Sequence, residues 1–306
     1  MRTNLLKKGS NIGLMIVIML MTSGFIYAQS ENGIFSPYYQ NKKIDKSFSV
    51  NKESKLYVDN IFGNINVEYW NENEVSISVN VKIIDSDQET AKKLLDATVV
   101  DINNSGKNIK AKTTIGTVTR SNKNGNNINS INVSYDIKMP TYMTCNFKNQ
   151  FGDINMPEKN VGNYDIDIQF GNIKAGDFSG ELNLKSQYGK KNSLGLLENA
   201  DIEISFGEMA LDINNAGFEK ISISPSFSKV RIQADKKASF NIYTKKNNSS
   251  KFSVKGFDNV INESLSDNEY DSKKDNTFNG SINGGKNGNI ILKGAEFSSF
   301  SLTAKD

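Results

Sequence analysis

Paired carboxylates are the first residues in this sequence whose types and spacing could do chemistry. Asp165 and Asp167 lie two apart in an alternating stretch, and so do Glu72 and Glu74. Such pairs can bind calcium or share acid–base work. Because alternation places both members of a pair on the solvent side of a strand, we expect solvated carboxylates rather than a site.

A lone cysteine and a glycine-rich stretch are the other local candidates. Cys145 has no second cysteine to pair with, so we expect a small buried hydrophobe on a strand. A reactive thiol or an intermolecular bridge is the alternative. The stretch Gly284-Gly285-Lys286-Asn287-Gly288 lacks the phosphate-binding Walker spacing and predicts a turn.

The absence of histidine removes whole classes of reaction. A chain with no histidine has no Ser-His-Asp triad, no Cys-His pair and no His-based zinc site. We therefore predict no catalytic residue, no cofactor-binding residue and no metal site. A polysaccharide-active solenoid enzyme is the one enzymatic alternative, and it would need a basic residue beside acidic calcium ligands in a groove.

The N-terminal residues predict export. Arg2, Lys7 and Lys8 precede an apolar stretch over 12–21, and small residues lead to Ala28. This order is typical of a secretory signal peptide cleaved between Ala28 and Gln29, with an uncleaved anchor as the alternative. We expect a periplasmic, outer-surface or secreted protein with no membrane span in the mature chain.

The charge balance argues against a nucleic-acid partner. The chain has 37 Lys and Arg against 34 Asp and Glu. Removing Arg2, Lys7 and Lys8 with residues 1–28 leaves 34 of each, a balance of zero. Nucleic-acid binders carry a positive excess, so we expect a protein or glycan partner at the envelope or cell surface instead.

An aromatic–glycine pair repeats through the chain and carries the fold prediction. The intervals between aromatics from Phe151 to Phe227 are 19, 18, 18 and 21 residues. The predicted repeat residues are Phe62, Gly63, Phe151, Gly152, Phe170, Gly171, Tyr188, Gly189, Phe206, Gly207 and Phe227. Short alternating segments such as Asp165–Ile168 recur 12 to 15 residues after each aromatic. Stacked coils of this kind predict an all-β, right-handed, two-sheet β-solenoid with coils of about 18–21 residues.

The aromatic and the glycine each have a structural interpretation. We expect the aromatics to stack on successive coils inside the core, with a carbohydrate-binding aromatic stripe as the alternative. The glycine would supply a positive φ or allow close approach of the backbone. The residues before the aromatics are Gln150, Gln169, Gln187, Ser205 and Ser226, and they could form a polar ladder. Lys190-Lys191 after Tyr188 interrupts the pattern and suggests a local bulge.

The predicted organisation divides the chain into four parts. Residues 1–28 are the signal peptide and 29–45 a linker. Residues 46–140 are an N-terminal β region with a helix over 86–98, which begins at a capping box in Ser86–Glu89 and covers a sheet edge. Residues 141–306 are a repetitive β-solenoid continuous with that region, with a last coil after Gly280.

The chain resembles the bacterial putative adhesin domain family of toast-rack-like, head-GIN-type envelope solenoids, whose function is unknown. The resemblance rests on Ile61–Val67, the strand Trp70–Val81, the helix 86–98, and Val133–Pro140 with Phe147–Ile154. It implies an exported β-solenoid without known catalysis. We therefore expect a non-enzymatic envelope or surface protein, an adhesin or binding scaffold. A periplasmic envelope-stress regulator or sensor is the alternative.

Overall fold

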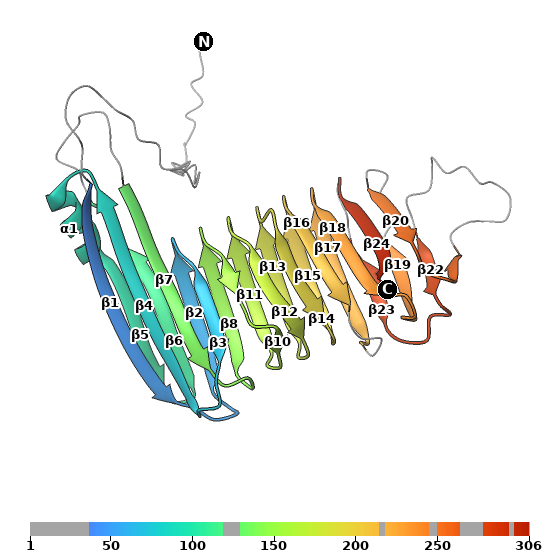
Figure 1. The fold of residues 1–306 in the computed structure, drawn as a ribbon, viewed down its shortest axis with the longest axis horizontal. Coiled ribbons are helices and arrows are strands. Elements are labelled where there is room, and N and C mark those ends of the chain that lie inside the picture. The colour runs from blue at the N-terminus through green and yellow to red at the C-terminus, as the bar shows by residue number, and fades with distance from the viewer. Residues whose placement is uncertain are drawn as a thin grey trace, which may run out of the picture. The chain divides into compact units, whose positions relative to one another are not determined.

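The computed structural model describes residues 37–118, 129–213, 218–244, 250–263, 278–293 and 297–305. Pro37–Asp306 is one compact unit. Within the described ranges the chain forms two 12-stranded sheets and one helix (Figure 1). The predicted all-β class is confirmed. The predicted signal peptide and its cleavage site at Ala28 lie outside the described residues.

The first sheet, sheet A, contains the edge strand nearest the N-terminus. In spatial order its strands are β1 (Tyr38–Ser49), β4 (Glu74–Asp85), β7 (Asn129–Met139), β3 (Ile65–Tyr69), β9 (Ile154–Asn155), β12 (Ile173–Phe178), β14 (Asn192–Leu196), β16 (Glu208–Ile213), β18 (Lys229–Asp235), β24 (Ser299–Lys305) and β20 (Lys251–Lys255), with β10 (Lys159–Asn160) beside β12.

The second sheet, sheet B, supplies the other wall of the core. In spatial order its strands are β21 (Val260–Asn262), β22 (Asn279–Ile282), β19 (Phe240–Thr244), β23 (Asn289–Leu292), β17 (Lys220–Ser226), β15 (Ala200–Ser205), β13 (Leu182–Gln187), β11 (Tyr164–Gln169), β8 (Thr144–Gln150), β2 (Lys55–Ile61), β6 (Asn108–Ile115) and β5 (Thr98–Ser105).

From β8 to β18 the chain alternates between the two sheets, and each strand pairs in parallel with an equivalent one a coil later. The alternating segments predicted from the sequence are the sheet B strands. Their apolar members, such as Ile166 and Ile168 on β11, are fully buried between the sheets. The polar members face outward, as alternation in a half-buried strand requires.

Both ends of the stack depart from sequence order. At one end β2 lies between β6 and β8, and β3 lies between β7 and β9. At the other, β23 lies between β17 and β19, and β24 between β18 and β20 (Figure 1). The coil predicted to be last is therefore intercalated, and the segment containing Phe240 is not the neighbour of β17. Parallel pairing permits this because a later strand can fill a gap left by an earlier one.

Two predicted boundaries near the N-terminus are wrong. The linker expected over 29–45 overlaps β1, which pairs antiparallel with β4 along twelve residues. The helix α1 spans Gln88–Ala97, and its N-cap is Asp87 rather than Ser86. The Asp87 carboxylate accepts a hydrogen bond from the Thr90 amide at 2.7 Å, which satisfies a free first-turn donor. The helix packs against β4 and both edge strands, β1 and β5, where a cover for a sheet edge was expected.

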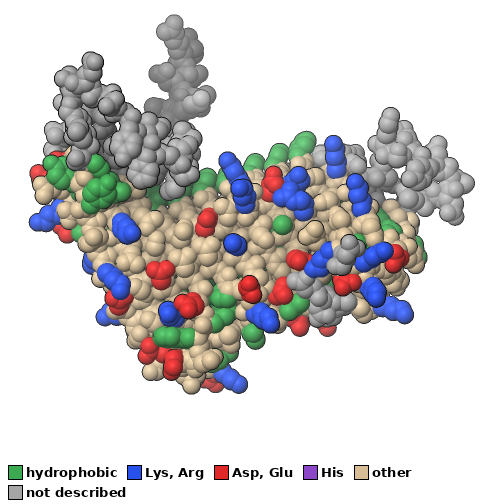
Figure 2. Space-filling view, viewed as in Figure 1, with side chains coloured by type: hydrophobic (Ala, Val, Ile, Leu, Met, Phe, Trp, Pro, Cys, Tyr) green, Lys and Arg blue, Asp and Glu red, His purple; other side chains and the backbone are tan. Residues whose placement is uncertain are grey.

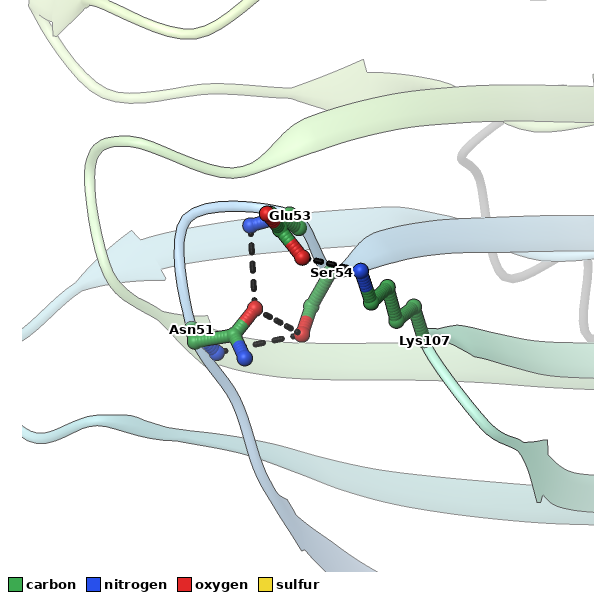
Figure 3. Close-up of polar contacts among 4 residues, drawn as sticks. All are labelled: Asn51, Glu53, Ser54 and Lys107. Atoms are coloured by element: carbon green, nitrogen blue, oxygen red, sulfur yellow. Dashed lines mark hydrogen bonds and ion pairs between the residues drawn. The ribbon is translucent and has the colours of Figure 1, made fainter.

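A polar turn joins β1 to β2 and ties it to the turn before β6 (Figure 3). The Asn51 side-chain oxygen accepts from the Glu53 amide at 2.9 Å, and the Asn51 amide donates to the Ser54 hydroxyl at 3.1 Å. Lys107 forms an ion pair with Glu53, which lowers the pKa of that carboxyl. These contacts hold the turn that sends β2 into the other sheet.

Candidate binding site

A single file of aromatic rings runs along one corner of the stack, where sheet B strands turn into sheet A. We call it the aromatic ridge, and its members in the described residues are Phe62, Phe151, Phe170, Tyr188, Phe206, Phe227 and Phe297. Successive ring centroids lie 4.7 to 5.3 Å apart, and their planes are within 19° of parallel. The predicted stacking is confirmed.

Every ridge aromatic has a left-handed backbone. Their φ values run from 45° at Phe297 to 64° at Phe62. This conformation costs a non-glycine residue about 1–2 kcal/mol. The prediction that glycine supplies the positive φ is therefore wrong for the repeat, because the aromatic itself takes that conformation.

The ridge is at the surface, which overturns the expectation of a buried core ladder. The exposed fractions are 48% for Phe170, 45% for Tyr188, 50% for Phe206, 45% for Phe227 and 67% for Phe297, while Phe62 and Phe151 are partly buried. Figure 2 shows hydrophobic side chains along the upper rim of this unit, over the strand ends. Stacking covers the ring faces, so the rings present their edges to solvent.

The glycine after each aromatic forms a floor beneath the ridge. A Cβ on Gly152 would lie 2.0 Å from the Gly63 carbonyl oxygen, and one on Gly171 would lie 1.9 Å from that of Gly152. Close backbone approach, the second predicted role, is thus the reason for glycine. The two C-terminal coils carry Ser228 and Ser298 here, and the Ser228 hydroxyl donates to the Ser226 carbonyl at 2.7 Å.

The irregular coil at Tyr188 contains one extra residue. Asn192, not Lys191, pairs with Met209 and so occupies the inward position that apolar residues fill in neighbouring coils. Its side chain accepts from the Ile173 amide at 3.0 Å and donates to the carbonyls of Gly189 and Glu208. The predicted bulge is therefore an insertion whose unpaired backbone groups are satisfied by a buried amide.

The residues before the ridge form the predicted ladder on the outer face of sheet B. We call it the amide row, and Gln150, Gln169, Gln187, Ser205 and Ser226 stand in register along it. Within the described part of the chain, the side-chain amides of the three glutamines have no hydrogen-bond partner in the protein. They are therefore free to meet a ligand beside the rings.

A shallow hollow of about 460 Å³ adjoins the amide row at its N-terminal end. Gln150 and Gln169 form part of its lining, together with a row of charges two residues further from the ridge. In register order the charged row is Lys112, Asp59, Lys148, Asp167, Lys185 and Glu203. Opposite charges alternate from strand to strand, so the face beside the ridge has no net sign.

The other candidates from the sequence do not assemble into a site. Asp165 accepts a hydrogen bond from the Asn146 amide at 2.7 Å on the outer face, and Asp167 belongs to the charged row. Glu72 lies in a turn and Glu74 begins β4, so they do not share a strand. Residues 284–288 form the predicted turn, with positive φ at three glycines. Among the described residues, no three His, Cys, Asp or Glu side chains gather as metal ligands would.

Buried hydroxyl and thiol groups lie in the core below the charged face. Cys145 is buried as predicted, and burial raises the pKa of its thiol far above the usual range. The Tyr69 and Tyr164 hydroxyls lie 2.6 Å apart, and Tyr69 donates to Asn160 at 2.8 Å. Burial raises the pKa of both phenols. These groups remain protonated at neutral pH and act as core polar contacts.

One ridge residue was missed by the sequence prediction. Phe297 stacks on Phe227 at 5.3 Å because β24 is intercalated beside β18. Its signal was present, since Phe297-Ser298-Ser299-Phe300 has the same pattern as Phe227-Ser228-Lys229-Val230. The 70-residue gap concealed it, because the search followed a constant interval. Within the described residues, no helix has the length and apolar character needed to cross a membrane.

Comparisons with known proteins complete the description of the site. No family model matches this chain, and no curated protein matches it. Among solved structures, a "putative cell adhesion protein" from Clostridium sporogenes is similar at 15% identity, covering 87% of this chain and 100% of the other, with a TM-score of 0.34. A "putative adhesin" from Bacteroides fragilis has 10% identity, covers 86% and 97%, and has a TM-score of 0.40. One from Parabacteroides merdae has 9% identity, covers 85% and 96%, and has a TM-score of 0.31.

Proposed function

We propose that this chain is an exported, non-enzymatic binding protein of the cell envelope or surface, and that it holds its partner along the aromatic ridge. The observation that supports this most directly is the exposure of the ridge. Strained, half-exposed aromatics at every coil are expensive compared with glycine or asparagine, which adopt the same backbone without strain. Strain that recurs at one surface is typical of a functional site.

The N-terminal residues support the exported part of the proposal. The basic residues, the apolar stretch and Ala28 form the order that the secretion machinery recognises. Expression of the full chain in a bacterial host tests this part. Sequencing of the exported product should show a start at Gln29. An intact N-terminus on protein that stays in the cytoplasm would contradict export.

Binding is tested on the purified mature chain with an immobilised panel. The panel contains polysaccharides, extracellular-matrix proteins and vesicles of phosphatidylcholine or phosphatidylglycerol. A ridge variant replaces Phe151, Phe170 and Tyr188 by asparagine, which tolerates the left-handed backbone. The native chain should be retained by at least one surface, and the ridge variant should lose that retention with its melting temperature preserved.

Two outcomes would overturn the proposed function. Equal retention of the native chain and the ridge variant would remove the ridge as the binding surface. Release of new reducing ends or unsaturated sugar products from any polysaccharide in the panel would show an enzyme.

A further inference from the structure

The ridge and the amide row together define what kind of ligand fits. Each central coil presents one ring edge and one side-chain amide or hydroxyl, and the next coil repeats them about 5 Å away. A one-dimensional array of identical contacts suits a linear, periodic ligand. A globular surface or a peptide of mixed sequence would not repeat its groups at this interval.

The chemistry of the exposed groups favours an oxygen-rich ligand. An aromatic ring is negative on its face and positive at its edge. Because stacking leaves only the edges of Phe170, Tyr188 and their neighbours exposed, the ridge offers weakly positive C–H groups to ligand oxygens. The free glutamine amides beside them both donate and accept hydrogen bonds.

The backbone along the ridge cannot pair with an added strand. The amides of Phe151, Phe170 and Tyr188 already donate to the carbonyls of Gln169, Gln187 and Ser205 in the next coil. A peptide that binds by strand addition needs free main-chain groups on its template. Recognition at the ridge therefore depends on side chains alone.

The charges beside the ridge argue for an uncharged ligand. The charged row alternates in sign, and two of its pairs, Lys112–Asp59 and Lys185–Glu203, lie at 3.4 and 3.2 Å. A face with no net sign offers no long-range attraction to an anionic polymer or an anionic membrane.

We propose that the aromatic ridge and the amide row bind an uncharged linear polysaccharide that lies across the coils. This ligand class rests on the proposed function, since it specifies the partner of the same surface. Sugar hydroxyls would hydrogen-bond to the amide row, and sugar oxygens would contact the ring edges. Each added sugar unit reaches a further ring and amide, so affinity grows with chain length.

Affinity electrophoresis and calorimetry on the mature chain test the proposal. The neutral probes are hydroxyethylcellulose, xylan and mannan, and the anionic probes are polygalacturonate and heparin. We expect at least one neutral polymer to bind with little salt dependence and the anionic polymers to bind weakly. A hexasaccharide of the bound polymer should bind at least about tenfold tighter than its disaccharide.

Two substitutions on strand β13 separate the site from the rest of the sheet. Gln187→Leu removes an amide from the amide row, and Asn183→Leu removes one from the same face of the same strand, four residues from the ridge. We expect Gln187→Leu to weaken binding by about threefold to tenfold and Asn183→Leu to leave it unchanged. Equal losses would contradict a site at the ridge.

The other results divide cleanly. If no neutral polymer binds while the panel still shows ridge-dependent retention on a protein or vesicle, the polysaccharide proposal fails and the proposed function stands. If only the anionic polymers bind, and salt abolishes that binding, the ligand class is wrong. If no panel surface retains the native chain, both proposals fail.

Discussion

Phe170 and Gly171 are neighbours in one repeated motif, yet the two rows that they belong to have opposite physical roles. The aromatic ridge is half exposed, left-handed and stacked ring on ring. The glycine floor beneath it lies so close to the adjacent coil that no Cβ fits at Gly171. The comparison teaches that one periodic motif can combine a residue required by the fold with a residue that the fold merely tolerates.

The largest effect is expected from filling the floor. Gly171→Ala places a Cβ 1.9 Å from the Gly152 carbonyl oxygen, which is backbone and cannot rotate away. We expect a loss of about 4 kcal/mol or more in the free energy of unfolding, measured by urea denaturation. Gly106→Ala is the control, since nothing lies within 4 Å of its Cβ and only its φ of 65° is strained. The control should cost about 1–2 kcal/mol. Equal costs would show that the floor is not tight.

A core substitution calibrates what true burial costs. Ile166→Ala removes a fully buried side chain between the sheets and should cost about 3 kcal/mol in the free energy of unfolding. Asp165→Ala, on the outward side of the same strand, should change it by less than about 0.5 kcal/mol. Similar values for the two variants would mean that the inward and outward faces of β11 had been exchanged.

The inserted residue at the irregular coil gives an intermediate test. Asn192→Leu matches the apolar residues of the neighbouring coils but leaves the Ile173 amide and the Gly189 carbonyl without their partner. We expect a loss of about 2 kcal/mol in denaturant unfolding. A gain in stability would show that the position requires an apolar residue and that the backbone groups find other partners.

The smallest effect is expected on the ridge. Phe170→Asn removes ring contacts to Phe151 and Tyr188 but suits the left-handed backbone better. The two changes oppose each other, so we expect the free energy of unfolding to change by less than about 1 kcal/mol. A loss of about 3–5 kcal/mol, typical of a buried phenylalanine, would instead restore the core interpretation of the aromatics.

The sequence predicted the strands of the central coils well because their periodicity is local. Alternating residues such as Asp165–Ile168 show which side chains face inward, and the intervals of 18 to 21 residues show how the strands align. The ends were predicted less well. The intercalation of β2–β3 and β23–β24 depends on which strand edge is open in space, and no local pattern records that.

The sequence by itself determined the all-β class, the repeat and the stacking of its aromatics, since each depends on residue type and interval. Only the tertiary structure decided which side of the coil those aromatics face. A residue at a corner belongs to neither the inward nor the outward row of a strand, so alternation assigns it no side. Its exposure follows from the left-handed turn at Phe170 and the close approach of the coils at Gly171, which together direct the ring away from the core.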